Sequence, residues 1–262
     1  MRLRSLLYVP ADNERFIAKA HERGADAIIL DLEDSVRPEH RDAARKSLGT
    51  SIRLAGQAGA KVFVRINTES ATEDASAAAG SDGLYVPKAS RARIEALATD
   101  GPNLPLFALV EDPMALLDVA AIAAHSAVSG LAAGGEDLAT ALGAVPDPDV
   151  LRTPKLLIHY AAKAHGKLSL GLFRSIADYA DLSAIEHAAK EARRHGFDGA
   201  SCVHPSAVPI LNAVFAPTSE ELDWAHRVLA TAETNKAGAF RVDGRMIDAP
   251  IIARARSILS QT

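Results

Sequence analysis

The stretch Ala27-Ile-Ile-Leu-Asp-Leu-Glu-Asp34 begins with four apolar residues and then turns acidic. A strand that lacks alternating polar residues has both faces buried, which is typical of a parallel sheet covered by helices. We therefore predict a parallel strand over Ala27–Leu32, with acidic residues at its carboxyl end. Runs of similar length and largely apolar composition predict further strands at Ser5–Pro10, Lys61–Asn67, Gly83–Lys88, Leu104–Val110, Val128–Ala133, Leu168–Leu172 and Gly199–His204.

Segments with helical periodicity lie between most of these strands. A regular alternation of strand and helix predicts an α/β fold with a parallel sheet, and eight strands predict a (β/α)8 TIM barrel. A doubly wound sheet is the alternative, but no glycine-rich phosphate-binding turn follows the first strand. The amphipathic segments include Glu14–Arg23, Ala43–Ala58, Arg91–Ala98, Ala115–Ala124 and Leu182–His195.

The chain continues past the eighth strand for longer than a barrel requires. A capping box at Thr218-Ser-Glu-Glu221 predicts a helix over Glu220–Asn235, and a second helix is predicted over Pro250–Ser260. The segment between them is short and mixed in composition. We expect a catalytic barrel over residues 1–216 and a helical extension over residues 217–262, which packs on a neighbouring subunit or forms a lid.

The composition argues against several classes of protein. The 262 residues are 48% hydrophobic, enough for a large core, and carry a formal net charge of −4. A negative net charge argues against binding to nucleic acid or to an anionic membrane surface. Cys202 is the single cysteine, so the chain forms no internal disulfide and no thiolate zinc cluster. There is no signal-peptide pattern and no apolar run of the ~20 residues that span a bilayer, so we expect a cytoplasmic globular protein.

Two isolated carboxylates, Glu111 and Asp137, each end a separate apolar run. The carboxyl ends of the strands form the active-site face of a (β/α)8 barrel, so these acids are expected to converge there. Two carboxylates with water and substrate oxygens suit Mg²⁺, and the lack of a His-Glu-x-x-His motif lowers the expectation of zinc. The alternative is that each acid caps a helix or pairs with a lysine.

Arg65 lies in the largely apolar third strand, and Asp31, Glu33 and Asp34 follow the second. An arginine among apolar neighbours needs a partner, because burying an unpaired charge is costly. We expect the three acids to orient Arg65 or to hold metal-bound waters, and Arg65 to bind a carboxylate or a developing enolate oxygen. The alternatives are a purely structural pair of Arg65 with Glu33 and helix capping by the acids. Lys88 is a candidate Schiff-base lysine, which a metal-binding acid pair would make redundant.

Short motifs in a fixed order cover almost the whole chain. They are Arg4-Ser-Leu-Leu-Tyr-Val-Pro10, Ala27-Ile-Ile-Leu-Asp-Leu-Glu-Asp-Ser-Val36, Val64-Arg-Ile-Asn67, Val86-Pro-Lys88, Val110-Glu111, Gly134-Gly-Glu-Asp-Leu138, His204-Pro205 and Gly244-Arg-Met-Ile-Asp-Ala-Pro250. Any one of these motifs is weak, but the ordered set is specific. On this set the chain resembles the citrate lyase beta-subunit family of the aldolase/citrate lyase superfamily, which belongs with the malyl-CoA and citramalyl-CoA lyases.

The resemblance implies a (β/α)8 barrel that makes or breaks a carbon–carbon bond in a 3-hydroxyacyl-CoA thioester such as malyl-CoA or citramalyl-CoA. The products of cleavage would be an acyl-CoA and a 2-oxoacid. Glu111 and Asp137 match the residues that hold Mg²⁺, and Arg65 matches the arginine that steadies the thioester oxygen. The backbone amides of Gly135 and Glu136 match those that hold the substrate carboxylate.

The same resemblance implies residues outside the strand ends. Asn13, Arg15 and Lys19 lie where relatives contact the CoA phosphates. Asp248 matches a catalytic acid that related lyases deliver from a neighbouring subunit. Family members are commonly trimers or hexamers, so we expect a homo-oligomer such as a homotrimer, in agreement with the C-terminal extension.

Two other functions stay open from the sequence. One is a class II pyruvate-type aldolase that acts on free hydroxy-oxoacids, which CoA dependence would distinguish from a thioester lyase. The other is an inactive barrel that binds CoA thioesters, but a scaffold would need neither Arg65 nor the acids at 111, 137 and 248. Nucleic acid and membranes are not expected partners.

Overall fold

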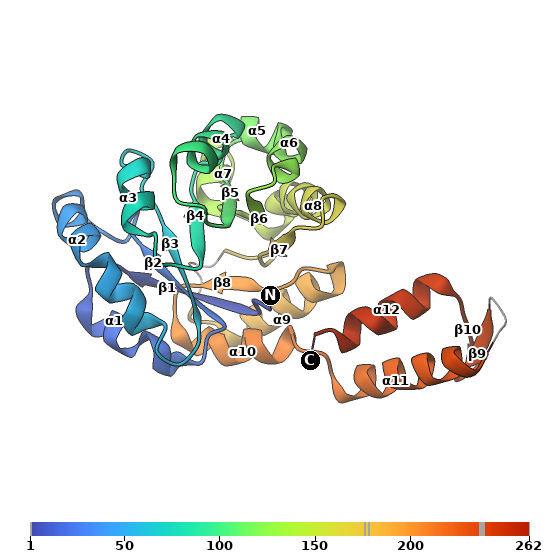
Figure 1. Ribbon diagram of the computed structural model, residues 1–262. Helices are drawn as coiled ribbons and strands as arrows, with labels where there is room; N and C mark the ends of the chain where they lie inside the picture. Colours follow the sequence, from blue (N-terminus) through green and yellow to red (C-terminus); the bar gives the residue numbers. More distant parts are fainter. Residues whose placement is uncertain (1, 176, 178, 236–238, 262) are drawn as a thin grey trace. The chain divides into compact units, whose positions relative to one another are not determined.

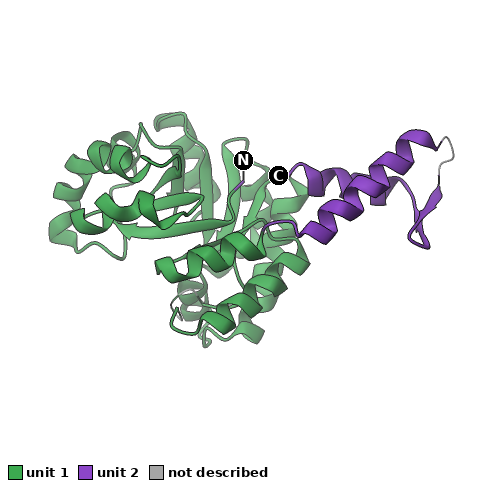
Figure 2. Ribbon diagram, turned by 90° about the horizontal axis from the view of Figure 1, so that it is seen from below, with its two compact units in different colours: residues 1, 3–215 green, residues 2, 216–262 purple. Residues whose placement is uncertain are grey.

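The computed structural model describes residues 2–175, 177, 179–235 and 239–261. The chain divides into two compact units, Leu3–Phe215 and a second unit that begins at Ala216 (Figure 2). Within the described residues, no helix combines the length and the apolar composition that crossing a membrane requires.

The first unit is built on a sheet of eight parallel strands (Figure 1). Strands that follow one another in sequence lie side by side, and β1 also pairs with β8. A bridge between Leu170 and Gly199 joins the two ends of the sheet. The sheet is a nearly closed barrel, which confirms the predicted (β/α)8 architecture. The strands are β1 (Ser5–Pro10), β2 (Ala27–Asp31), β3 (Lys61–Arg65), β4 (Gly83–Val86), β5 (Leu106–Val110), β6 (Val128–Ala133), β7 (Leu168–Leu170) and β8 (Ala200–Cys202).

Helices surround this sheet and connect its strands (Figure 1). The predicted helix Ala115–Ala124 is instead two short helices, because the chain leaves helical geometry at Asp118, with ψ of 9°. The helices are α1 (Glu14–Ala20), α2 (Pro38–Ala55), α3 (Ala71–Ala77), α4 (Arg91–Asp100), α5 (Pro113–Leu117), α6 (Val119–Ala124), α7 (Gly135–Ala141), α8 (Pro148–Ala164), α9 (Leu182–His195) and α10 (Val208–Val214), with 3₁₀ turns at His21–Arg23 and Pro205–Ala207.

Alternate strand residues point into the barrel and pack on one another. The rings of Phe63 and Phe107 meet edge-to-face at a centroid distance of 4.7 Å, and Tyr85 stacks on Phe107 at 5.5 Å. All three rings are buried, so they close the barrel interior. Inward positions recur every second residue, which makes Arg65 the next inward residue after Phe63 and places Glu111 two inward positions beyond Phe107. The aromatic layer is therefore the floor beneath the charged residues.

Five strands, β2, β3, β4, β7 and β8, end earlier than predicted, and the backbone shows the reason for β3 and β4. Strand β3 ends at Arg65 rather than Asn67, whose N–H donates to the Asp74 carboxylate at 2.7 Å instead of to a neighbouring strand. Strand β4 ends at Val86, because Lys88 has a φ of +46°, in the left-handed region that a strand does not contain.

The second unit consists of two helices and a hairpin, packed on a core of its own. Helix α11 (Ser219–Thr234) carries the predicted capping box between Thr218 and Glu221, and α12 (Ala249–Leu259) is the second predicted helix. The mixed segment between them starts at Gly238, which lies outside the described residues, and contains the antiparallel strands β9 (Phe240–Val242) and β10 (Arg245–Ile247).

Candidate active site

A cavity of about 420 Å³ opens at the carboxyl ends of the barrel strands. Its wall is formed by inward-facing residues at the strand ends and by the loops that follow them. This end of a (β/α)8 barrel is the one on which active sites are built. The charged side chains that line it are Asp31, Asp34, Arg65, Glu111, Glu136, Asp137, Lys155 and Arg174.

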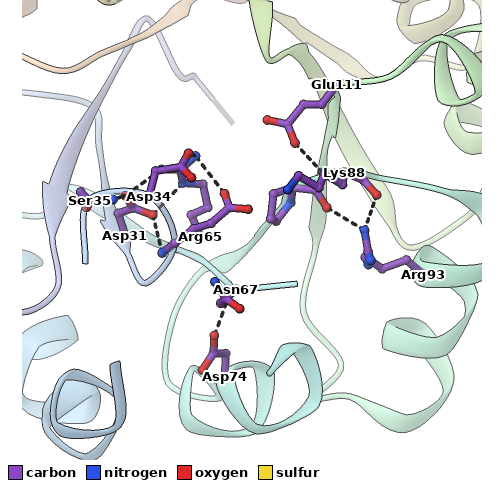
Figure 3. A network of polar contacts seen from close by, with 11 residues as sticks. Asp31, Asp34, Ser35, Arg65, Asn67, Asp74, Lys88, Arg93 and Glu111 are labelled. Atoms are coloured by element: carbon purple, nitrogen blue, oxygen red, sulfur yellow. Dashed lines mark hydrogen bonds and ion pairs between the residues drawn. The ribbon is translucent and has the colours of Figure 1, made fainter. Parts of the chain in front are cut away.

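Arg65 lies within the acidic cluster that follows β2 (Figure 3). Its Nε and Nη2 donate to the two carboxylate oxygens of Asp31 at 2.6 and 2.7 Å. Its Nη1 lies 3.0 Å from Glu33 Oε2 and 3.0 Å from Asp34 Oδ2. The acids are therefore partners of Arg65 rather than side-chain caps of α2, and the arginine is not paired with Glu33 alone.

Burial gives the members of this cluster different proton affinities. It raises the pKa of Glu33 to about 8, although the charge of Arg65 opposes the shift. Burial also acts to raise the pKa of Asp31, but hydrogen bonds and the charge of Arg65 outweigh it and hold that pKa below its usual value. The same pairing outweighs the burial of Arg65 and raises the pKa of its guanidinium. Arg65 therefore stays charged, with ionised Asp31 as its main partner.

The guanidinium of Arg65 keeps one donor for another molecule. A guanidinium has five N–H groups; Asp31 and Asp34 accept hydrogen bonds from three of them, and Glu33 forms an ion pair with Nη1. Among the described residues, the remaining N–H on Nη2 has no acceptor. The ring of Tyr8 lies 5.1 Å from the guanidinium carbon and covers one face of the group.

Glu111 is held by the main chain of the loop after β4 (Figure 3). The Lys88 N–H donates to Glu111 Oε2 at 2.6 Å, whereas the Lys88 side chain is exposed and does not line the cavity. That position does not favour Lys88 as a Schiff-base lysine. Arg93 Nη1 donates to the carbonyl of Pro87 at 3.2 Å and to that of Lys88. The Pro87 carbonyl and the Lys88 N–H belong to one planar peptide group, so Arg93 fixes the donor that binds Glu111.

Glu111 and Asp137 both line the cavity, and their surroundings fit a cation. Burial raises the pKa of Glu111 to about 7; the Lys88 N–H opposes this shift and the charge of Asp137 adds to it. A bound cation would offset both the burial and the repulsion. Within the described part of the chain, no group of three or more His, Cys, Asp or Glu is arranged to hold a metal. A pair of carboxylates that leaves most positions to water and substrate is the donor set that suits Mg²⁺.

Gly134 allows this geometry, because its main chain lies directly against Glu111. A Cβ atom at Gly134 would be 2.3 Å from Glu111 Oε1. Gly135 and Glu136 follow in the first turn of α7 and line the cavity beside Asp137. Ser175 Oγ donates to the Glu136 carboxylate and ties α7 to the loop after β7.

The predicted CoA-binding residues lie on α1, and the predicted base belongs to the second unit. Asn13 caps α1 with its side chain, and Arg15 and Lys19 are exposed on that helix, which follows β1 at the cavity end of the barrel. None of the three is among the residues that line the cavity. Asp248 belongs to the second unit, where its side chain caps α12. The functional roles of these four residues stay predictions.

Three residues of the site are not singled out by the sequence analysis. Lys155 lies on the buried face of α8, so a lysine at a position of the helical pattern that is otherwise apolar is a signal in the sequence. Tyr8 lies two residues before the end of β1, and the alternation of inward and outward positions along that strand could have predicted that it faces the barrel interior. Arg93 had no local signal, since it acts through carbonyl groups of another segment.

Comparisons with known proteins agree with this architecture. Residues 4–205 match the HpcH/HpaI aldolase/citrate lyase family. The chain is 37% identical to a (3S)-malyl-CoA thioesterase of Cereibacter sphaeroides, over 98% of this chain and 94% of the relative. It is 35% identical to a citrate lyase subunit beta-like protein of Mycobacterium tuberculosis, over 97% and 93% of the two chains.

Solved structures show the same relationship. The protein CitE from Mycobacterium tuberculosis, in complex with magnesium, acetoacetate and coenzyme A, matches with a TM-score of 0.80 and 34% identity, over 98% of this chain and 97% of that one. A citrate lyase beta subunit of the same organism, complexed with oxaloacetate and magnesium, gives a TM-score of 0.71 and 32% identity, over 82% and 98%. The ordered motifs, the barrel and these matches agree, and the chain belongs to the HpcH/HpaI aldolase/citrate lyase family.

Proposed function

We propose that this chain is a Mg²⁺-dependent carbon–carbon lyase that acts on a 3-hydroxyacyl-CoA thioester such as malyl-CoA or citramalyl-CoA. The products would be an acyl-CoA and a 2-oxoacid, and the reaction would be reversible. The observation that carries the proposal is the position of Arg65 in one cavity with Glu111 and Asp137. A permanently charged donor beside two carboxylates suits a reaction in which an enolate forms next to a chelated oxyacid.

In cleavage, the bond between the thioester α-carbon and the hydroxyl-bearing carbon breaks. The hydroxyl proton goes to a base, and the electrons of the broken bond move to the thioester carbonyl, which becomes an enolate and then takes a proton. The free N–H of Arg65 is suited to that enolate oxygen. Asp31 keeps the guanidinium of Arg65 protonated, and the positive charge of this group stabilises the enolate more than the neutral carbonyl.

Glu111 and Asp137 would hold the metal, which supplies a Lewis acid for the hydroxyl and ketone oxygens of the oxyacid half. The Lys88 N–H keeps Glu111 in place for this role, and Gly134 leaves room for its carboxylate. The main-chain amides of Gly135 and Glu136 would bind the substrate carboxylate.

In condensation, Asp248 from a neighbouring subunit would remove the proton from the acyl methyl carbon. The CoA phosphates would contact Asn13, Arg15 and Lys19. The two cations, Arg15 and Lys19, are one helical turn apart on α1 and therefore present positive charge on one face of the helix. We therefore also propose a homo-oligomer, such as a trimer or hexamer, in which the second unit of one protomer completes the site of another.

The named relatives support this substrate class. The Cereibacter sphaeroides protein is a malyl-CoA thioesterase, and the Mycobacterium tuberculosis structures contain magnesium with coenzyme A, acetoacetate or oxaloacetate. The thioesterase name also makes thioester hydrolysis a second candidate, in which water cleaves the carbon–sulfur bond and leaves the carbon skeleton intact.

The test is a product analysis with a panel of malyl- and citramalyl-CoA isomers, with and without Mg²⁺. A lyase releases acetyl-CoA or propionyl-CoA and a 2-oxoacid that forms a phenylhydrazone, whereas a thioesterase releases free CoA thiol and a hydroxyacid. We expect lyase products from the wild type and none from Glu111→Ala or Asp137→Ala. Glu73→Ala, which removes an exposed carboxylate on α3, serves as the control.

Other outcomes would overturn the proposal. Free thiol without acyl-CoA would favour the thioesterase. Turnover of free hydroxy-oxoacids alone would favour a class II aldolase. Thioester binding without any turnover would favour an inactive barrel.

A further inference from the structure

Lys155 is a buried cation that the proposed mechanism does not use. It comes from α8, outside the barrel, and reaches the cavity wall with 6% of its surface exposed. Its ammonium donates to two main-chain carbonyls, those of Leu172 at 2.8 Å and Arg174 at 3.2 Å. An ammonium has three N–H donors, so one of them lacks an acceptor among the described residues.

A buried charge of this kind is costly unless an opposite charge accompanies it. Within the described residues, no carboxylate lies at ion-pairing distance from Lys155, and its hydrogen-bond partners are neutral carbonyls. Burial lowers the pKa of this lysine to about 8, and the charge of Glu136 offsets only part of the effect. The folded protein therefore retains a cation that lacks a close anionic partner.

The position of the ammonium shows where that partner would lie. A Cβ atom at Gly135 would be 3.6 Å from Lys155 Nζ, so the ammonium lies directly beside the main chain of Gly135 on the cavity wall. Gly135 is next but one to Asp137, the candidate metal-binding acid. An anion held by Lys155 would thus lie beside the main chain of Gly135, two residues before Asp137.

We propose that Lys155, together with the main-chain amides of Gly135 and Glu136, binds the carboxylate of the 2-oxoacid half of the substrate and thereby selects acids over neutral aldehydes or ketones. The identity of that acid as a 2-oxoacid rests on the proposed function. The alternative is that Lys155 serves only to hold the loop after β7 by its two carbonyl contacts, and the experiment separates the two roles.

The experiment is calorimetric titration of pyruvate and of its neutral amide into the full-length protein with saturating Mg²⁺. For Lys155→Met we expect a loss of pyruvate affinity of about 10- to 100-fold, the effect of removing a buried charge-assisted hydrogen bond. Lys155→Arg, which keeps the charge, should restore most of the affinity, and binding of the amide should change little. Lys190→Met removes an exposed lysine that pairs with Glu186 on α9 and should leave affinity unchanged.

Equal pyruvate affinity in the wild type and a folded Lys155→Met protein would overturn the proposal, even if the wild type is a thioester lyase. Lys155-dependent binding without any thioester cleavage would support the role of Lys155 and refute the proposed function. If Lys155→Met does not fold, lysine ¹⁵N or ¹³C NMR of the wild type gives the answer. Pyruvate should raise the pKa of the Lys155 amine, and an unchanged pKa at saturation would overturn the proposal.

Discussion

Gly134→Ala is the substitution whose effect follows most directly from the geometry of the site. Gly134 has φ −84° and ψ 90°, a conformation open to any residue, so alanine adds no backbone strain there. Its added Cβ would lie 2.3 Å from Oε1, 2.4 Å from Cγ and 2.8 Å from Cδ of Glu111. Ordinary contacts of a Cβ begin at 3.4 Å, so the carboxylate would have to move by about 1.1 Å.

A displacement of that size removes Glu111 from its position relative to Asp137 and breaks the 2.6 Å bond from the Lys88 N–H. A shift of about 1 Å in a positioned catalytic group costs on the order of 10²-fold in rate. We expect Gly134→Ala to lower kcat for thioester cleavage by about 10²-fold and Mg²⁺ affinity by about 10- to 100-fold. The two readouts are acyl-CoA release and calorimetric titration of Mg²⁺.

Two controls make the result specific. Gly49→Ala adds a methyl group in α2 where no atom apart from the helix's own nearby backbone lies within 4 Å, and it should leave Mg²⁺ affinity and kcat unchanged. In a Glu111→Ala background, Gly134→Ala should have no further effect, because the carboxylate it displaces is gone. A folded Gly134→Ala protein with wild-type Mg²⁺ affinity and kcat would refute the assignment of Glu111 as a metal ligand.

Three further predictions concern the groups that hold the site. Asp31→Asn removes the buried carboxylate partner of Arg65 and should lower the free energy of unfolding by about 3–5 kcal/mol, measured by urea denaturation. Arg93→Ala frees the peptide group that donates to Glu111 and should weaken Mg²⁺ binding by about 10-fold, measured by calorimetry. Burial raises the pKa of Glu33 to about 8, so the folded state binds its proton more tightly than the unfolded state. The contribution of Glu33 to stability is therefore present at pH 4 and is lost as the pH rises to 8, and Glu33→Gln should reduce the decline in unfolding free energy over that range.

Matched variants test each reason. Asp42→Asn removes an exposed partner of Arg45 and should cost less than about 1 kcal/mol; an equal loss for Asp31→Asn would mean that burial does not set the effect. Arg91→Ala changes an exposed arginine at the start of α4 and should leave Mg²⁺ affinity intact. If Glu33→Gln and the wild type show the same pH dependence of unfolding, folding does not raise the pKa of Glu33.

The part of the site that could be predicted from the sequence lies on the strands. Arg65 and Glu111 could be placed because inward positions alternate along a strand and end at a known face of the barrel. Lys155 and Arg93 could not be placed in this way, because they come from helices whose approach to the strand ends depends on tertiary packing. The predicted helix Ala115–Ala124 is wrong for a different, local reason, because the backbone leaves helical geometry at Asp118 within the apolar pattern.

The charges of the cavity wall indicate which kind of substrate the site fits. Five carboxylates and three cationic side chains line it among the described residues, an excess of two negative charges when all are ionised. Burial raises the pKa of Glu111 and repulsion from Asp137 and Asp34 adds to this shift. The excess negative charge of the wall equals the charge of one divalent cation. With such a cation bound beside Glu111 and Asp137, the wall would be near neutral, and Lys155 and the free N–H of Arg65 would act as separate positive sites. A substrate with a carboxylate at one end and a developing enolate at the other matches that distribution, whereas a neutral aldehyde or a dianionic phosphate does not.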